Sequence, residues 1–378
     1  MRIAVLLTHI GHTTISYELA ERTGRDTDAD VTVICYEIGS LEEVEVSVDT
    51  DAVDIVTLGA EGRFDPGAIR RLRSLLASGE FDLLHTHHNF VGSLGRALAP
   101  RDLPIVDTEH ADHRLHYSPL QNAVNDATLR RADRVVANSQ ATLDSFYPHE
   151  RLLVPAWKRR VIYNGVDLEA IDDARAGEKN GDESGDGFEG GTDWETDRPR
   201  VVTVGRLIGA KNHSTLIEAF DDVRDSVPDA ELLIVGDGPQ RESLERLVAA
   251  RRLGEHVRFT GTVSRKEVYR ILDSSDAFAL PSRSEGFCVA LVEAMACGLA
   301  PVVSDIPVLH EVAGEAAAFA DPERPVGFAM QLRRLLSDSK ARETLGEAAE
   351  ERARTEFPLD RAVERYAELY ETLVQARA

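Results

Sequence analysis

The 378-residue chain is poor in lysine, cysteine and aromatic residues, and it has a large deficit of positive charge. Only five of its 43 basic residues are lysines, and its 66 acidic residues leave a net charge of −23. A field of this sign repels nucleic acid and anionic lipid, so neither is expected as a general partner. The composition favours a halophilic protein adapted to concentrated salt, where the Debye length falls to about 3 Å. An acidic protein without that adaptation stays an alternative.

The few cysteines and the short apolar runs exclude two further classes of protein. Cys35, Cys288 and Cys297 show neither a disulfide framework nor the spacing of a metal site, and they indicate buried thiols in a reducing compartment. The apolar run at the N-terminus has about six residues, which is too short for a signal peptide or a membrane span. We therefore expect a cytoplasmic protein, and a peripheral position at the inner membrane face stays open.

Short apolar runs alternate with longer amphipathic stretches, once before residue 165 and again after residue 200. This alternation is typical of parallel strands in strand–helix–strand units, and 378 residues are too many for one ordinary core. We predict an α/β protein with two Rossmann-like domains whose parallel sheets face each other across a cleft. The predicted strands cover residues 3–7, 31–35, 81–84, 105–106, 134–137, 201–204, 232–235, 257–259, 277–280 and 301–303, and the clearest helices cover 69–76, 120–132, 213–227 and 241–253.

An acidic, glycine-rich segment separates the two halves. It has little apolar surface to bury, so it is predicted to be a solvated insertion without chemistry of its own. The predicted organisation is an N-terminal domain at residues 1–168, a linker at 169–199 and a C-terminal domain at 200–357.

The strongest candidate for chemistry is PSRSEGFCVALVEAMACG, residues 281–298, which predicts a strand end, a turn and a helix that begins close to Phe287. Glu285 precedes the helix, and Glu293 lies two turns along it. Free N–H groups at a helix start attract an anion, and carboxylates accept hydrogen bonds from sugar and ribose hydroxyls. Alternatively, Glu285 is a helix N-terminal charge and Glu293 a surface residue, although a carboxylate in so apolar a helix needs a partner. The N–H groups expected to face the anion are those of Gly286, Phe287 and Cys288.

A second candidate is VVTVGRLIGAKNH, residues 201–213, in which a strand ends and a glycine makes the turn. Arg206 and Lys211 follow, five residues apart. Two cations beside the free N–H groups of a helix start can hold a diphosphate, although ordinary surface charge stays an alternative. The segment VGDGPQ, residues 235–240, adds a weaker glycine turn after another predicted strand.

Two weaker signals lie in the N-terminal half. Gly11 follows the first strand, and it either lets the backbone approach a phosphate or is only a turn glycine. His87 and His110 end neighbouring predicted strands, where a neutral imidazole can bond a sugar hydroxyl. A metal cluster is an alternative, but no histidine spacing matches a familiar ligand set. Histidines satisfied by protein groups are expected at His85, His88, His113 and His116.

Together these motifs resemble the retaining glycosyltransferases of family four, also called glycosyl transferases group one, which have the GT-B fold. Glu285 and Glu293 match the family's spaced glutamates, and GRLIGAKN matches its Gly-Arg-Leu…Lys segment. The segments VIYNGVD (161–167), ANS (137–139) and TEH (108–110) also look like family pieces, in the same order. The closing FPLDRAVERYAELYETL resembles the family's last helix, so residues 358–378 are expected to return to the N-terminal domain.

The resemblance implies a retaining transferase that uses a nucleotide-diphosphate sugar, with a glycan, a lipid-linked molecule or a small molecule as acceptor. It implies no metal and no cofactor, and a transient membrane-surface contact stays open. Two positions depart from the family: Gly11 is followed by His12 in place of a second glycine, and Cys288 stands where glycine or proline is usual. The implied roles are diphosphate binding for Arg206 and Lys211, ribose binding for Glu293, donor-sugar contact for Glu285 with the backbone of Gly286, Phe287 and Cys288, a place beside the reacting centre for His110, and approach to the phosphates and acceptor path for Gly11.

Two other functions compete with the transferase. Nucleotide-sugar 2-epimerases have a similar fold, but they are not expected to combine the GRL…K segment with the spaced glutamates. A non-catalytic nucleotide-sugar binder would need the same donor-binding residues. The products separate the three: a glycoside with nucleoside diphosphate, an epimerised donor, or none.

Overall fold

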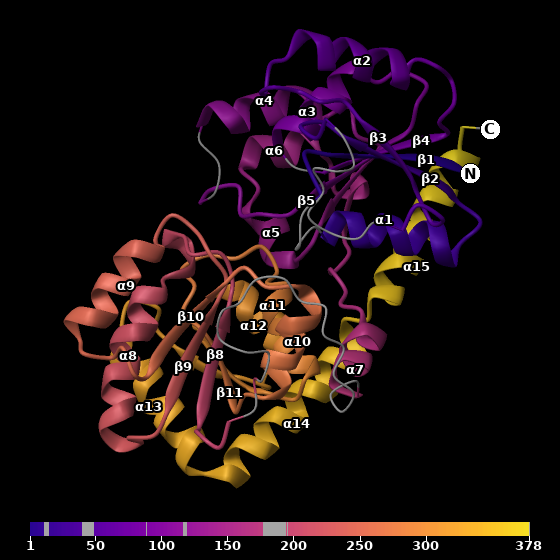
Figure 1. The fold of residues 1–378 in the computed structure, drawn as a ribbon. Helices are drawn as coiled ribbons and strands as arrows, with labels where there is room; N and C mark the ends of the chain where they lie inside the picture. The colour runs from indigo at the N-terminus through magenta and orange to yellow at the C-terminus, as the bar shows by residue number, and fades with distance from the viewer. Residues whose placement is uncertain are drawn as a thin grey trace. The chain divides into compact units, whose positions relative to one another are not determined.

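The computed structural model describes residues 1–10, 15–39, 49–87, 89–115, 119–176, 194 and 196–377. The chain divides into two compact units (Figure 1). Unit 1 comprises Met1–Gly165 and Leu359–Ala378, and unit 2 comprises Val166–Pro358. Across the described ranges, no helix is both long and apolar enough to cross a membrane.

The described part of unit 1 has one sheet of seven parallel strands. From edge to edge these are β3 (Asp54–Thr57), β2 (Asp30–Cys35), β1 (Arg2–Leu7), β4 (Leu83–His87), β5 (Ile105–Glu109), β6 (Arg134–Ala137) and β7 (Arg159–Val161). The strand order reverses between β1 and β4, so the chain leaves these neighbours in opposite directions. In open α/β sheets the carboxyl ends of strands at such a point border the ligand-binding crevice.

Alternate side chains of β1 enter two different cores, because successive residues of a strand point to opposite faces. Ile3, Val5 and Leu7 pack with α1 (Ile15–Asp26) and α15 (Leu359–Gln375). Ala4 and Leu6 pack in the core that α2 (Pro66–Leu76) and α3 (Asn89–Leu98) cover. The other helices in the described residues of unit 1 are α4 (Pro119–Leu129), α5 (Gln140–Ser145), α6 (Pro148–Leu153) and the 3-10 turn η2 (Ala156–Lys158).

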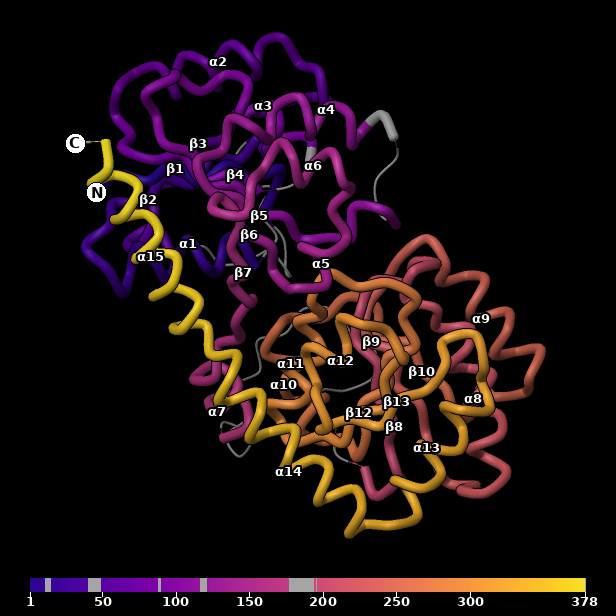
Figure 2. Tube along the Cα trace, turned by 180° about the vertical axis from the view of Figure 1, so that it is seen from behind, coloured from indigo at the N-terminus to yellow at the C-terminus, as the bar shows by residue number. Residues whose placement is uncertain are grey.

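The last helix, α15, belongs to unit 1 although all of unit 2 precedes it in the sequence. It packs beside α1, and the two chain ends lie close together at one end of unit 1 (Figures 1 and 2). The expectation that the closing segment returns to the N-terminal domain is therefore confirmed. The buried residues of α15 form one helical stripe: Leu359, Ala362, Val363, Tyr366, Leu369, Tyr370 and Leu373.

Unit 2 has a second parallel sheet, of six strands in the described residues. In spatial order they are β10 (Val257–Gly261), β9 (Glu231–Val235), β8 (Arg200–Val204), β11 (Ala277–Leu280), β12 (Ala300–Ser304) and β13 (Ala318–Ala320). The order reverses between β8 and β11, so the second crevice is expected where the turns after these strands meet. The helical elements found in the described part of this unit are α7 (Leu168–Ala176), η4 (Gly209–Lys211), α8 (His213–Ser226), α9 (Arg241–Ala250), α10 (Arg265–Asp273), α11 (Val289–Ala296), α12 (Pro307–Ala313), α13 (Pro325–Ser337) and α14 (Ser339–Glu356).

The predicted α/β class with two parallel sheets is confirmed, and each predicted strand overlaps an observed one. Three of the described strands, β3, β7 and β13, were not predicted from the sequence. Each is an edge strand of three or four residues, and most of its side chains are partly exposed. An edge strand needs no continuous apolar run, so the signal used to find strands is missing there.

The predicted linker at residues 169–199 is too long at its start. Residues 168–176 form α7, which buries Ile171 and Ala174. Asp172 binds Arg354 at 2.6 Å, and Trp194 is buried near the other end of the segment. These contacts attach both flanks to unit 2. Residues 177–193 and 195 lie outside the described residues, so the rest of the linker prediction stays a prediction.

Candidate functional site

The turns after β8 and β9 interlock through glycines. Gly236 has φ +125°, and a Cβ atom there would lie 2.3 Å from the carbonyl oxygen of Gly205. A Cβ atom on Gly238 would lie 2.7 Å from the carbonyl oxygen of Leu207, whose own N–H donates to the carbonyl of Asp237 at 2.9 Å. The GRL and VGDG motifs thus form one close-packed pair of turns that larger residues would push apart.

Lys211 and Glu285 are joined where the strand order of unit 2 reverses. Lys211 ends η4 after β8, and Glu285 lies in the turn after β11. The ammonium donates to Oε1 of Glu285 at 2.7 Å, and the Ser282 hydroxyl donates to the same oxygen at 2.6 Å. Burial opposes the charge on Lys211, but the carboxylate outweighs it and raises the pKa of this ammonium above its ordinary value. The turns at the reversal of strand order therefore carry a nearly buried ion pair.

Arg206 lies in the same loop between β8 and α8 as Lys211, but its surroundings differ. Its side chain is exposed, and no hydrogen bond or ion pair joins it to another described residue. The side chain of Lys211, in contrast, is only 19% exposed and is neutralised by its partner. The turn therefore offers one uncompensated cation and one cation that is already paired.

Glu293 is buried in the apolar helix α11, with 7% of its side chain exposed. Arg265 lies against it, with Nη2 2.6 Å from Oε1. The Tyr269 hydroxyl lies 3.5 Å from the same oxygen and accepts from Nε of Arg265 at 2.8 Å. The expectation that this carboxylate needs a partner is confirmed. Sequence reasoning missed both partners, since an Arg and a Tyr one turn apart on α10 carry no distinctive signal.

Cys288 occupies an unusual backbone position at the start of α11. It is buried, and its φ of 73° lies in the left-handed region that favours glycine. The helix begins at Val289, so Gly286 and Phe287 lie in the turn before it. Burial raises the pKa of the Cys288 thiol to about 12, which keeps it protonated and unreactive. Phe287 is buried and packs edge-on against Phe357 at 5.3 Å between ring centroids.

In unit 1, a second cluster of polar side chains lies where β1 and β4 are neighbours. His87 ends β4 and His110 follows β5, and these strands pair side by side as the sequence predicted. Nδ1 of His87 lies 2.9 Å from Nε2 of His110. The hydroxyl of Ser16, from the first turn of α1, lies 3.0 Å from Nδ1 of His87 and 3.4 Å from Nε2 of His110. Three elements therefore converge on one hydrogen-bonded group.

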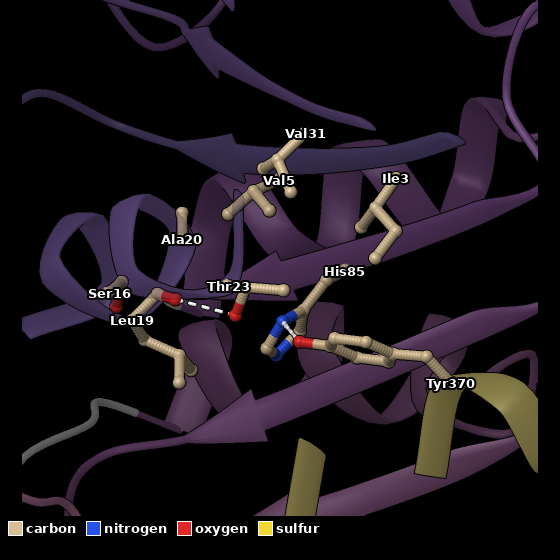
Figure 3. Close-up of a pocket in the computed structure, with 9 residues that line it drawn as sticks. All are labelled: Ile3, Val5, Ser16, Leu19, Ala20, Thr23, Val31, His85 and Tyr370. Carbon is tan, nitrogen blue, oxygen red and sulfur yellow. Dashed lines mark hydrogen bonds between the residues drawn. The ribbon is translucent and has the colours of Figure 1, made fainter. Parts of the chain in front are cut away.

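His85 lies two residues before His87 on β4, and both of its ring nitrogens have a hydrogen-bond partner. Its Nδ1 lies 2.7 Å from the hydroxyl of Tyr370, and its Nε2 lies 2.8 Å from that of Thr108. Figure 3 shows Tyr370 reaching His85 from α15. The Thr108 hydroxyl also lies 3.0 Å from that of Tyr366. Burial lowers the pKa of His85 to about 3, so this ring is neutral. Sequence reasoning missed both tyrosines because they lie 258 and 285 residues from their partners.

His113 also has a partner at each ring nitrogen, but unlike His85 it is a charged imidazolium. Its Nδ1 lies 2.8 Å from Glu150, and its Nε2 lies 3.3 Å from Glu109. Burial opposes the charge, but the two carboxylates raise the pKa of His113 to about 10. Beside it, Arg96 pairs with Asp107 in the same interior. These ion pairs fix the backbone on both sides of His110, through Asp107 before it and His113 after it.

Four sequence candidates lie outside the described residues: Gly11, His12, His88 and His116. Within the ranges that are described, no three His, Cys, Asp or Glu side chains are grouped so as to hold a metal ion.

Comparison with known families gives two matches that together cover most of the chain. Residues 11–170 match the family described as Glycosyltransferase Family 4. Residues 189–352 match the family described as Glycosyl transferases group 1. The second match contains both the GRL…K segment and the two spaced glutamates.

Curated relatives match over parts of their length. A phosphatidyl-myo-inositol mannosyltransferase from Mycolicibacterium smegmatis is 30% identical over 294 residues, which cover 74% of this chain and 68% of that protein. A sulfoquinovosyl transferase from Arabidopsis thaliana is 34% identical over 163 residues, 42% of this chain and 30% of that protein. For four of the curated relatives, the matched region spans between 30% and 66% of the relative's length.

Solved structures match over the whole chain at low identity. A structure of HepE from Anabaena in complex with UDP-glucose has a TM-score of 0.78 and 21% identity, and covers 99% of this chain and 100% of that one. Sucrose-phosphate synthase from Thermosynechococcus elongatus has a TM-score of 0.77 and 22% identity, with 100% of both chains covered. At this identity the likeness establishes the fold.

Proposed function

The chain belongs to the glycosyl transferases group 1 and has the GT-B fold, and on that premise we propose that it is a retaining glycosyltransferase with a nucleotide-diphosphate sugar as donor. The acceptor in this proposal is a hydroxyl group of a glycan, a lipid-linked molecule or a small molecule. One relative is named phosphatidyl-myo-inositol mannosyltransferase, and this name supports a lipid-linked acceptor among the three.

The ion pair of Lys211 and Glu285 is the observation that carries the proposal. It lies at the reversal of strand order in unit 2, where ligands of such sheets bind. A diphosphate that reaches Lys211 takes over as its counter-ion, and Glu285 becomes available for the hydroxyls of the attached sugar. The exposed guanidinium of Arg206 supplies a further positive charge that attracts the diphosphate. It can also donate two parallel hydrogen bonds to a phosphate group.

Glu293 is assigned to the ribose of the donor. Arg265 and Tyr269 both approach its Oε1, which fixes the carboxylate in orientation. No bond to Oε2 is found among the described residues, so that oxygen can accept from a ribose hydroxyl. A carboxylate held in this way binds a diol without having to be reoriented, and this preorganisation favours binding.

Retention in this proposal follows front-face attack. The bond between the anomeric carbon and the diphosphate oxygen breaks, the acceptor oxygen bonds to the same face of the sugar, and a phosphate oxygen takes the acceptor proton. His110 is assigned to the donor sugar beside the reacting centre, where its imidazole can bond a hydroxyl group. Arg206 and Lys211 stabilise the charge that grows on the leaving diphosphate, so no metal ion is required.

A screen of nucleotide sugars tests the proposal. Thermal shift in buffer of high salt identifies the donor, since a ligand that binds only the folded state raises its stability. UDP-glucose is the first probe because the structural neighbour holds it. Incubation with acceptors and analysis by NMR then separates three outcomes: a glycoside with retained configuration, an epimerised donor, or no product. Either of the last two, or an inverted linkage, contradicts the proposal.

A further inference from the structure

His110 is held from behind by a second imidazole. We infer that His87 is a positioning residue for His110, which it holds in one orientation and one tautomer through the 2.9 Å contact between Nδ1 of His87 and Nε2 of His110. This inference rests on the proposed function, in which His110 lies beside the reacting centre. His87 itself is assigned no contact with the donor or the acceptor.

His87 is suited to this role because its ring is fixed on its other side. Its side chain is buried, and its ring centroid lies 3.9 Å from that of His85. His85 is in turn fixed by Tyr370 and Thr108, one at each nitrogen. His85, Thr108 and Tyr370 are all buried, so solvent does not compete for these bonds, and Figure 3 shows the one between His85 and Tyr370. The C-terminal helix α15 thus supports the ring on which His87 lies.

The bond between the two imidazoles couples their tautomers. One hydrogen lies between Nδ1 of His87 and Nε2 of His110, so one ring donates and the other accepts. If His110 accepts at Nε2, its own proton lies on Nδ1, and the reverse holds if it donates. The hydroxyl of Ser16 lies within reach of both atoms. Whichever arrangement is occupied, removing Nδ1 of His87 removes the hydrogen bond between the two rings.

Two replacements of His87 separate the hydrogen bond from the packing. His87→Phe keeps a ring against His85 and loses the bonding atom, whereas His87→Asn loses the ring and keeps a polar atom near the position of Nδ1. We expect His87→Phe to lower kcat by roughly tenfold to a hundredfold, because His110 is no longer held in place. We expect His87→Asn to keep kcat within about threefold of wild type. Both variants should bind nucleoside diphosphate as wild type does, since Arg206, Lys211 and Glu293, which are proposed to hold the diphosphate and the ribose, are unchanged.

A double-mutant cycle shows whether His87 acts through His110. In the His110→Ala background, His87→Phe is expected to have no further effect on kcat, because the residue that it positions is already absent. If the two substitutions multiply, His87 acts independently and the inference is wrong. It is equally wrong if His87→Phe keeps full kcat, or if His87→Asn is impaired as much as His87→Phe. Wild type is assayed in parallel, since a lack of transfer by wild type counts against the proposed function instead.

Discussion

Lys211 donates a 2.7 Å hydrogen bond to Glu285, and this bond ties the turn after β8 to the turn after β11. This salt bridge fixes the two turns relative to each other, and in the proposed function the same two groups bind the donor.

The first prediction concerns the two cations after β8. Arg206→Ala and Lys211→Ala should each lower kcat/KM by roughly tenfold to a thousandfold, because both charges face the diphosphate as it leaves. Lys211→Ala should also lower the melting temperature, since it leaves Glu285 without its cation, whereas Arg206→Ala should not. Arg246→Ala is the matched control, because Arg246 is exposed and, among the described residues, its partner is Glu242 on the surface of α9. Arg206 and Lys211 variants that behave like this control in steady-state kinetics would refute the assignment.

The second prediction separates the two glutamates. Glu285→Gln should lower kcat more than it weakens binding of free nucleoside diphosphate, because the carboxylate acts on the sugar. Glu293→Gln should mainly weaken nucleotide binding, because this carboxylate is assigned to the ribose. Calorimetry with nucleoside diphosphate, run beside turnover assays on both variants, measures the two effects. The placement is reversed if Glu285→Gln abolishes nucleotide binding while Glu293→Gln leaves it unchanged.

The third prediction concerns the left-handed residue at the start of α11. Cys288→Gly and Cys297→Gly remove the same buried side chain, but Cys297 has an ordinary φ of −81°. Relief of the left-handed conformation is worth about 1–2 kcal/mol, so Cys288→Gly should cost less stability than Cys297→Gly by about that amount. Urea unfolding of both variants measures the difference. Equal losses would show that the backbone at Cys288 is not strained.

The fourth prediction is a pH dependence of stability that originates at His113. Burial opposes its charge, but Glu109 and Glu150 raise the pKa of His113 from 6.5 to about 10 in the folded protein. A raised pKa contributes stability that is complete below the unfolded value of 6.5 and is lost as the pH rises through about 10. The free energy of unfolding should therefore fall between about pH 6.5 and about pH 10, and His113→Gln should reduce that fall. Parallel slopes for the variant and wild type, measured with urea, would contradict it.

The fifth prediction concerns metal. Transfer should continue in EDTA in buffer of high salt, because two cations are assigned to the leaving diphosphate and no metal is needed to neutralise it. The measurement is turnover before and after chelation, with manganese and magnesium added back. Loss of activity on chelation that either ion restores would overturn the metal-free mechanism.

Much of this protein follows from the sequence alone. Alternating apolar and amphipathic segments determined two parallel sheets, because a strand buried on both faces needs a continuous apolar run. Local spacing also put Lys211 and Glu285 in turns at the carboxyl ends of their strands, where such sheets bind ligands. The apolar surroundings of Glu293 required a partner for its charge, even though they did not identify it.

Only the tertiary structure decided which distant groups meet. Arg265 reaches Glu293 from another helix, and Tyr370 reaches His85 from the other end of the chain. Neither contact leaves a local pattern, because a single Arg or Tyr on a helix face looks the same whether it meets solvent or a buried partner. The hydrogen bond between His87 and His110 likewise depends on which strands are neighbours and on where each ring lies along its strand. Such contacts are set by the packing of whole elements, so spacing along the sequence does not determine them.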